Sequence, residues 1–406
     1  MMNQSAKLQQ LAQLGRVFTP SAPISQRDLF AGRLEQVMSV IGAIGQPGRQ
    51  VVIYGERGVG KTSLANLITQ LAFSDEQGQV QCVRVNCSTN DDFIKIWRRV
   101  FKEADMDWPD EWSGRTPEPD DIRRELQRHR PFIVVLDEFD RFEDDESLSQ
   151  MADLIKAVSD YALETKIVIV GVGSSISQLI GEHESIQRAL EEVLLPRMDE
   201  DEMRAILDNG ARATGISFDS TATTHILRIA EGLPTFVHLL ALAAGKRCLA
   251  DDRDVVTSDD VEQACHSAAK SHMLLSEYTQ AVQSSRTTTL FESVLTACAL
   301  AKKNPLGQFT ARAVQDPLNA IVNRHLDIAA FAPHLKAFTA IDRGSVLVQE
   351  GIRRRFTYRF RNPLLQPFTI LAAMANGLIP DDYLRVYFGD DVPASDHVVP
   401  PLEPIL

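Results

Sequence analysis

The sequence predicts an α/β protein in which a parallel sheet flanked by helices precedes an α-helical lid and a C-terminal winged-helix domain. Three observations support this prediction. Apolar, β-branched runs alternate with helical stretches in the first half of the chain, as expected for a parallel sheet with helical crossovers. Residues 200–273 carry helical apolar spacing throughout. From about residue 287, helices are followed by a basic hairpin and a closing helix.

Length and composition narrow the class of protein. The 406 residues indicate two or three domains at roughly 150 residues each. The net charge of −13 argues against a surface that coats nucleic acid. No apolar run approaches the roughly 18 residues that span a bilayer, and residues 1–15 lack the apolar core of a secretory signal. The five cysteines are scattered and odd in number. We therefore expect a cytoplasmic protein with reduced thiols and no membrane contact.

A phosphate-binding loop is the strongest motif. The segment RQVVIYGERGVGKTSLANLITQLA runs from an apolar strand through a Gly-rich turn into a helix, which is the context that G-x-x-x-x-G-K-[ST] requires. Backbone amides and the helix N-terminus would face phosphate oxygens. Lys61 would reach the β- and γ-phosphates, and Thr62 would present its hydroxyl to Mg²⁺. The predicted nucleotide-binding residues of this loop are Gly55, Glu56, Arg57, Gly58, Val59, Gly60, Lys61, Thr62 and Ser63.

Two acids follow a second buried strand. Residues 132–136 are apolar and are followed by Asp137 and Glu138, as at the carboxyl end of a strand buried on both faces. We expect Asp137 to hold the Mg²⁺ shell and Glu138 to polarise the water that attacks the γ-phosphate. Asp140 is interpreted as a surface or helix-capping acid. The predicted cofactors are ATP and Mg²⁺.

A third strand ends at Ser174 and Ser175. Ser174 is a candidate catalytic residue, because a small polar side chain there could contact the γ-phosphate or the attacking water. The alternative is that one of these serines caps the next helix. Another core strand ends near Asn86 and Ser88.

This order of phosphate loop, Asp-Glu strand, polar-ended strand and helical lid resembles the AAA+ superfamily of P-loop NTPases. More closely it resembles initiator-type ATPases of the origin-recognition kind and related bacterial ATPases of transposition and defence. The resemblance implies that Leu29 and Arg33, in the lead-in to the loop, line the adenine pocket. It also implies a composite site in a homo-oligomer, where an arginine before the fifth strand reaches a neighbour's γ-phosphate. Arg188 is the first candidate and Arg197 the second, against the alternative of ordinary surface arginines.

The lid departs from the arginine-bearing version of the superfamily. EGLPTFVHLL carries Gly-Leu-Pro where many members have an arginine for the γ-phosphate. It resembles the G-x-P version of signalling (STAND-type) and initiator-like ATPases, which implies that Pro234 lies at the nucleotide. His238 either contacts a phosphate or lies in the core.

The predicted winged helix concentrates positive charge. From residue 342 to residue 362, six arginines against two acids leave a net charge of +4. Arg353, Arg354 and Arg355 are the candidate contacts to double-stranded DNA. Alternatively the domain docks a protein or acts as an internal brake, and its arginines keep an exposed edge soluble.

The predicted organisation is a helix and adenine-side lead-in at 1–50, an ATPase core at 51–199, a lid at 200–275, a winged-helix domain at 286–378 and a Pro-rich tail at 379–406. We expect an ATP-hydrolysing switch that assembles with copies of itself and engages DNA or a separately encoded protein. The alternative is a STAND-like scaffold that uses ATP as a latch, hydrolyses it slowly and does not bind DNA.

Overall fold

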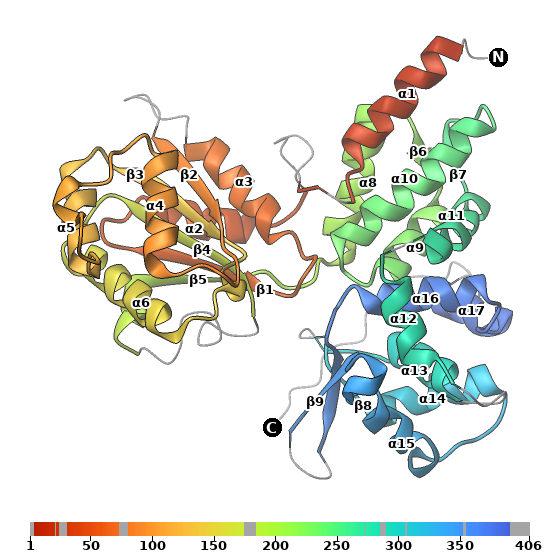
Figure 1. The fold of residues 1–406 in the computed structure, drawn as a ribbon. Coiled ribbons are helices and arrows are strands. Elements are labelled where there is room, and N and C mark those ends of the chain that lie inside the picture. Colours follow the sequence, from red (N-terminus) through yellow and green to blue (C-terminus); the bar gives the residue numbers. More distant parts are fainter. Residues whose placement is uncertain are drawn as a thin grey trace, which may run out of the picture.

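The chain folds into two bodies (Figure 1). The sheet body, residues 34–195, holds a parallel sheet and its helices. The helical body combines the N-terminal helix with the described helices and strands that follow the sheet. The computed structural model describes residues 4–20, 22–23, 31–72, 80–173, 184–271, 273–284, 290–304, 307–351 and 355–389.

The sheet has five parallel strands in the order β2-β3-β4-β1-β5. β3 is buried along its whole length, which explains why its sequence is a continuous apolar run. The carboxyl ends of β1 and β3 lie at one edge, so the phosphate loop and the Asp-Glu pair meet there. The strands are β1 (Gln50–Gly55), β2 (Gln81–Asn86), β3 (Phe132–Asp137), β4 (Lys166–Val172) and β5 (Leu190–Leu194).

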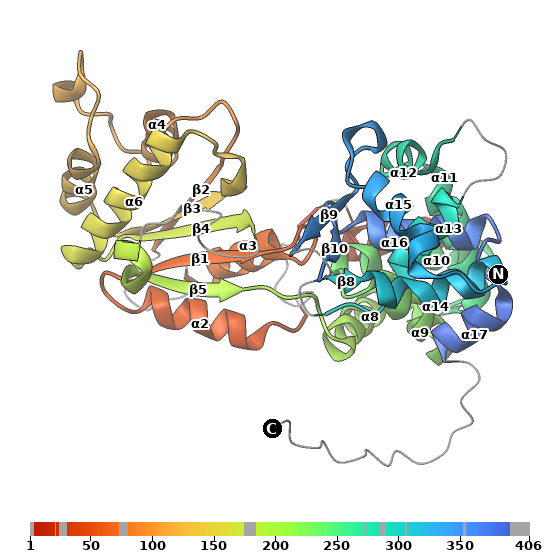
Figure 2. The ribbon, with the colours of Figure 1, turned by 90° about the horizontal axis from the view of Figure 1, so that it is seen from below.

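Helices cover both faces of this sheet (Figure 2). One hydrophobic core joins α2 and α3 to the sheet, and a second joins α4, α5 and α6 to the opposite face. Alternate residues of β1 enter different cores, Val51 and Ile53 one and Val52 the other. The elements are α2 (Leu34–Ile44), α3 (Lys61–Ala72), α4 (Phe93–Glu103), η2 (Asp110–Trp112), α5 (Pro119–Arg128), η3 (Phe139–Arg141), α6 (Asp145–Asp160) and η4 (Glu184–Ala189).

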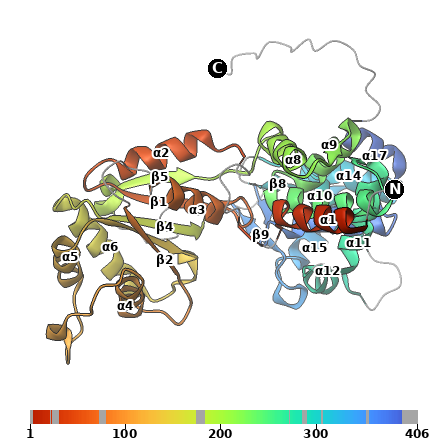
Figure 3. The ribbon, with the colours of Figure 1, turned by 90° about the horizontal axis from the view of Figure 1, so that it is seen from above.

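The lid and the N-terminal helix pack together. α1 lies against α8 and α10 (Figure 3), with Leu14 and Phe18 fully buried. Phe18 occupies the space that a side chain at Gly210 would need, so this glycine admits an aromatic ring between helices. The elements are α1 (Gln4–Val17), α8 (Glu200–Thr214), β6 (Ser217–Phe218), α9 (Ser220–Ala230), α10 (Pro234–Ala250), β7 (Val255–Val256), α11 (Ser258–Ser271) and α12 (Leu275–Val282).

The C-terminal elements follow the predicted order of three helices, a hairpin and a closing helix, with a short strand after the first helix that was not predicted. The strands form a sheet in the order β8-β10-β9. The same hydrophobic core runs through the lid and these elements, so the boundary predicted between residues 275 and 286 falls inside one packed unit. The elements are α13 (Phe291–Leu300), β8 (Phe309–Thr310), α14 (Ala311–Val322), α15 (Ile328–Ala337), η5 (Ile341–Arg343), β9 (Leu347–Glu350), β10 (Thr357–Phe360), α16 (Leu365–Ala375) and α17 (Asp381–Phe388).

α17 lies where the sequence analysis placed a Pro-rich tail. The helix begins after Pro380 and ends at Gly389, which has a left-handed backbone. Phe388 stacks on His225 of α9, with ring centroids 3.9 Å apart, and Tyr387 donates a hydrogen bond to Glu231 at 2.8 Å. The packed chain therefore extends further than predicted. Within the described part of the chain, no helix combines the length and apolar character needed to cross a bilayer.

Candidate nucleotide-binding site

The phosphate loop lies between β1 and α3, and its three glycines, Gly60 with φ 99° among them, have positive φ values that favour glycine. Gly55 has φ 152°, and a Cβ there would clash with the carbonyl oxygen of Leu195. Gly58 has φ 89°, and its missing Cβ would lie 2.6 Å from Leu364 of the α16 region. The loop is thus bounded on one side by the end of β5 and on another by the helical body.

Lys61 is the first residue of α3 and is buried. Its Nζ donates hydrogen bonds to the carbonyl oxygens of Gly55 at 3.1 Å and Glu56 at 2.7 Å. Burial lowers the pKa of Lys61 to about 8, although nearby Asp140 and Asp137 oppose that shift. Phosphate oxygens would supply a counter-charge that compensates for the hydration this ammonium group loses on burial.

Asp137 ends β3 and is buried, whereas Glu138 is exposed. One carboxylate oxygen of Asp137 accepts a hydrogen bond from the backbone N–H of Glu138 at 2.8 Å. The other accepts one from Nη2 of Arg84 at 2.5 Å. Glu138 has φ 54°, a left-handed conformation that is unfavourable for a non-glycine residue and that gathers at functional sites. It forms an ion pair with Arg141 at 2.9 Å.

Asp140 is exposed, as the first of its two interpretations has it, and it also makes a contact that the sequence analysis did not predict. Its carboxylate accepts a hydrogen bond from the backbone N–H of Val172 at 2.7 Å. This bond ties the loop after β3 to the end of β4, rather than capping a helix. Asp140 also raises the pKa of Lys61 by its charge, which puts it among the groups around the phosphate loop. The signal in the sequence is that Asp140 is the third acid of the segment DEFD, residues 137–140.

The donor set fits Mg²⁺ as well as a nucleotide. Thr62, at the N-terminus of α3, supplies a hydroxyl, and Asp137 supplies a carboxylate. Among the described residues no group of three or more His, Cys, Asp or Glu side chains forms a metal cluster. Mg²⁺ is usually held by one or two carboxylates together with substrate phosphates, so one protein carboxylate is what such a site requires.

The lid contacts the loop through the start of α10. Pro234 is the first residue of the helix, and its Cγ would lie 4.0 Å from a Cβ at Gly60. Thr235 donates its hydroxyl to the carbonyl oxygen of Gly58 at 3.3 Å. His238, one turn further, is buried with its ring edge against Phe18. Burial lowers its pKa to about 4, so the imidazole is neutral near pH 7 and carries no charge toward a phosphate.

Arg33 connects the loop to the lid. Its guanidinium Nη2 donates to the carbonyl oxygens of Val59 at 3.4 Å and Pro196 at 2.5 Å. Its backbone N–H donates to the carboxylate of Glu202 on α8 at 2.9 Å. The predicted adenine-side role of Arg33 stays a prediction. Leu29, the other predicted adenine-side contact, lies outside the described residues, and so does Ser174, the predicted contact to the γ-phosphate or the attacking water.

Arg197 connects the phosphate loop to both parts of the helical body. Its Nε donates to the carboxylate of Glu56 at 2.7 Å. Its Nη1 donates to the backbone carbonyl of Glu231 at 3.1 Å and to the side-chain oxygen of Gln366 on α16 at 2.8 Å. We call these four residues the Arg197 cluster. Because Arg197 is engaged in its own chain and 14% exposed, it is poorly placed as the second candidate for an inter-subunit arginine.

Arg188, the first candidate, is placed differently. It lies at the end of η4, and its side chain is 75% exposed. Its guanidinium contacts Asp160 of the same chain at 3.0 Å, a surface pair of little strength. The arginine is therefore accessible to a neighbouring molecule, and its predicted role stays a prediction.

Half of the arginines counted in the predicted basic wing are engaged within the chain. Arg343 covers the ring of Phe291, 3.3 Å from its centroid, and donates to two backbone carbonyl oxygens. Arg359 pairs with Glu350 at 2.8 Å, and Arg361 donates to a backbone carbonyl oxygen. Of the candidate DNA contacts, Arg355 is exposed, while Arg353 and Arg354 lie outside the described residues. The charge of +4 in the sequence thus overstates the charge free to meet a partner.

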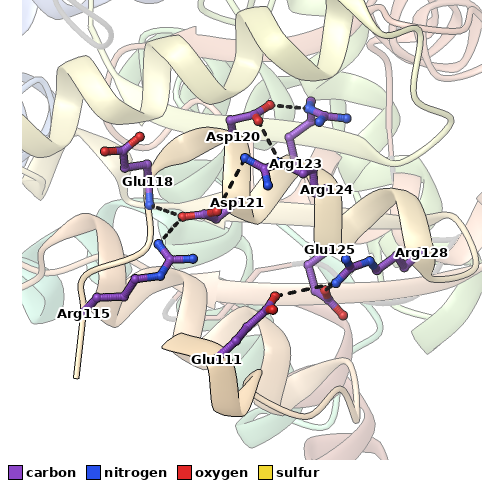
Figure 4. A network of polar contacts seen from close by, with 9 residues as sticks. All are labelled: Glu111, Arg115, Glu118, Asp120, Asp121, Arg123, Arg124, Glu125 and Arg128. Atoms are coloured by element: carbon purple, nitrogen blue, oxygen red, sulfur yellow. Dashed lines mark hydrogen bonds and ion pairs between the residues drawn. The ribbon is translucent and has the colours of Figure 1, made fainter. Parts of the chain in front are cut away.

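A separate cluster of charges surrounds α5 (Figure 4). Its acids and arginines neutralise one another, and they include a capping box at the start of the helix. The paired side chains range from buried, as Arg123 and Glu125 are, to exposed, and pairs of this kind support a helix end rather than a binding site. The pairs are Asp120 with Arg123 and Arg124, Asp121 with Arg115, and Glu125 with Arg128.

The parallel sheet, the phosphate loop and the helical lid define a P-loop NTPase of the AAA+ type. The solved Walker-type ATPase of Pyrococcus abyssi has this fold, with a TM-score of 0.50, 16% identity, and coverage of 87% of this chain and 99% of that one. The ORC2 protein of Aeropyrum pernix, solved as ADPNP–ADP complexes, gives a TM-score of 0.49 and 16% identity over 91% of this chain and 98% of that one.

Residues 23–285 match the model of the family Novel STAND NTPase 1. The chain belongs to this family. Curated relatives include ORC1-type DNA replication protein 17 of Haloarcula marismortui, 24% identical over 46% of this chain and 50% of the relative. ORC1-type DNA replication protein 2 of Thermoplasma acidophilum is 22% identical over 44% and 45%. The chain thus spans about half the length of these two relatives.

Proposed function

We propose that this protein is an ATP-dependent conformational switch. ATP is bound and hydrolysed at the phosphate loop, and the nucleotide state decides whether the helical body stays packed on that loop. The Arg197 cluster carries the proposal, because it attaches the loop residue Glu56 directly to the lid and to α16. Any movement of the loop that accompanies binding or hydrolysis must strain or release these contacts.

The residues of the site divide the chemistry among them. Lys61 and the loop amides bind the phosphates, while Thr62 and Asp137 orient the Mg²⁺ shell. Mg²⁺, when bound, neutralises charge that develops on the transferring phosphoryl group. Glu138 accepts the proton of the attacking water. Ser174 is proposed to orient that water from the neighbouring strand.

A second contact, made by Leu364, also holds the helical body on the phosphate loop. Leu364 packs against both the core of the helical body and the core of the sheet body, and it fills the space beside Gly58. The Arg197–Glu56 ion pair is partly buried, with side chains 14% and 24% exposed. Removing one of its partners therefore costs at most about 3 kcal/mol, which is roughly a hundredfold in an equilibrium constant. A nucleotide that favours one arrangement by a similar amount would therefore control the position of the helical body.

We further propose that the protein assembles with copies of itself in its open form, in which the helical body no longer packs on the phosphate loop. Arg188 would then complete the site of the neighbouring molecule, where a guanidinium stabilises the charge of the transferring phosphoryl group. The exposure of Arg188 supports this proposal. We propose that a separately encoded protein binds the surface that this opening exposes.

The test combines nucleotide binding with a measurement of shape. We expect the purified protein to bind ADP and ATP, and Lys61→Ala to lose both. We expect Arg197→Ala to increase the radius of gyration in small-angle scattering and to accelerate nucleotide release. Arg228→Ala, a change at an exposed arginine on α9, is the control. Unchanged ATP affinity in Lys61→Ala would refute the proposed nucleotide site. An unchanged radius of gyration in Arg197→Ala would refute only the proposed role of the Arg197 cluster in holding the two bodies together.

A second candidate function is engagement of double-stranded DNA by the hairpin. The three consecutive arginines at residues 353–355 support it, as do the names of the curated relatives, which are DNA replication proteins. Steady-state ATP hydrolysis with and without duplex DNA at low salt separates the two candidates. A rate that rises with DNA supports this function. A slow rate that does not change with DNA supports the first candidate function, in which the switch acts on a protein partner.

A further inference from the structure

Arg84 links three elements of the candidate site. Its Nη2 donates to the carboxylate of Asp137 at 2.5 Å, and its Nη1 donates to the side-chain oxygen of Asn66 at 2.6 Å. Asn66 lies on α3, one turn after Thr62. The guanidinium therefore bridges β2, the strand end that carries Asp137 and the helix that begins at the phosphate loop.

The strand geometry explains why Arg84 reaches this point. Val83 and Val85 enter the core beneath α4, α5 and α6, so Arg84 between them faces α3. In the β2–β3 register Arg84 is opposite Val135, and Asn86 is opposite Asp137. The long side chain thus runs toward the carboxyl end of the sheet and meets Asp137 from the side of α3.

The contact places a positive charge on the carboxylate assigned to Mg²⁺. The Asp137 side chain is 4% exposed, and that of Arg84 is 32% exposed. The second oxygen of Asp137 is occupied by a backbone N–H. A buried carboxylate requires a counter-charge and hydrogen bonds, and Arg84 provides both. A divalent cation at Asp137 would have to compete with a guanidinium for the same oxygen.

From this geometry, and resting on the nucleotide site proposed above, we propose that Arg84 takes the place of the divalent cation at Asp137 when a nucleoside diphosphate is bound. The diphosphate is then held by Lys61 and the loop amides, with Asp137 neutralised by Arg84. A triphosphate adds negative charge and raises the affinity for Mg²⁺, so Mg²⁺ displaces Arg84 in that state alone. The presence of Mg²⁺ at Asp137 thereby distinguishes the two nucleotides.

Equilibrium affinity for ADP carrying a methylanthraniloyl fluorophore, with excess Mg²⁺ or with EDTA, tests this proposal without measuring turnover. For the parent protein we expect the two affinities to agree within about threefold. In Arg84→Gln we expect Mg²⁺ to strengthen ADP binding by about tenfold or more, because Asp137 becomes available to the cation. Arg84→Lys keeps the charge and should behave as the parent protein does.

Arg99→Gln is the matched control. Arg99 also pairs with a carboxylate at 2.5 Å, Asp91, and donates to the backbone at the end of β2, but it does not contact Asp137 in any bond described. A parent protein whose ADP binding already depends on Mg²⁺ by tenfold overturns the proposal. So does an Arg84→Gln variant as insensitive to Mg²⁺ as the parent, or an Arg84→Lys variant that matches Arg84→Gln. A parent protein that binds no ADP refutes the proposed function instead.

Discussion

At the scale of single residues, Glu138 is both the predicted catalytic base and a residue with a strained backbone. Its φ of 54° is left-handed, and the side chain of the predicted base is 52% exposed. An L-residue in this region costs roughly 1 kcal/mol relative to glycine. Glycine would adopt this backbone conformation at a lower free energy, yet the residue here is glutamate. This agrees with a requirement for the carboxylate.

We expect Glu138→Gln to lower ATP hydrolysis by about a hundredfold or more while ATP binding is retained. Glu138→Gly should also abolish hydrolysis but raise the free energy of unfolding by about 0.5–1 kcal/mol. Steady-state phosphate release and urea unfolding measure the two effects. Asp105→Gly is the control, since Asp105 has φ 53° outside the site; it should be stabilising without changing hydrolysis.

His238 gives a prediction about acid stability. Its folded-state pKa of about 4 lies below the ordinary value of 6.5, so the unfolded chain binds the proton more readily. The stabilisation from the neutral imidazole is complete above pH 6.5 and is lost as the pH falls to about 4. The full effect is about 3 kcal/mol.

We therefore expect His238→Leu to unfold less steeply with acid than the parent protein between pH 6.5 and pH 4. Thermal unfolding at a series of pH values measures the slope. His325→Gln, at a side chain that is 75% exposed, is the control. Equal slopes for His238→Leu and the parent would contradict the buried, neutral histidine.

The site residues also show which chemistry a sequence reveals. Lys61, Thr62 and the glycines stand in one short motif, so their spacing alone predicts them. Arg197 finds its partners 34, 141 and 169 residues away, and Arg84 meets Asp137 across 53 residues. Such pairs depend on strand register and domain packing, which leave no local pattern in the chain.

At the scale of elements, the hairpin β9–β10 differs from the prediction in its available charge. Strand alternation and the turn glycine predict the hairpin correctly, because both signals are local. The free charge is not predictable in this way. Glu350 neutralises Arg359 only because the two strands place them together.

This difference sharpens the test of DNA binding. If the hairpin binds phosphates, replacing Arg353, Arg354 and Arg355 with glutamine should reduce the salt dependence of DNA affinity by up to about three ions. Fluorescence anisotropy with a labelled duplex at several salt concentrations measures it. Arg359→Gln should leave that slope unchanged, because the arginine is paired. An unaltered slope in the triple variant would exclude the hairpin.

At the scale of the whole molecule, exposure of Arg188 and the closed Arg197 cluster together predict assembly coupled to ATP. We expect Glu138→Gln with ATP to form oligomers, since bound ATP persists. Adding Arg188→Ala should return the protein to monomers. The exposed Arg204→Ala serves as the control in sedimentation velocity. Oligomers that persist without Arg188 would exclude the proposed inter-subunit role.

The route of the chain between the two bodies limits how they can move. The chain begins in the helical body, crosses at residues 31–33 into the sheet body, and returns at residues 195–199. Arg33 lies on the first crossing and bonds to Pro196 on the second. The sheet body is therefore an insertion carried on two adjacent tethers that are fastened together. If the helical body opens as proposed, such a body would swing without turning freely about its own axis, and each closure would return Gly58 to the same place beside Leu364.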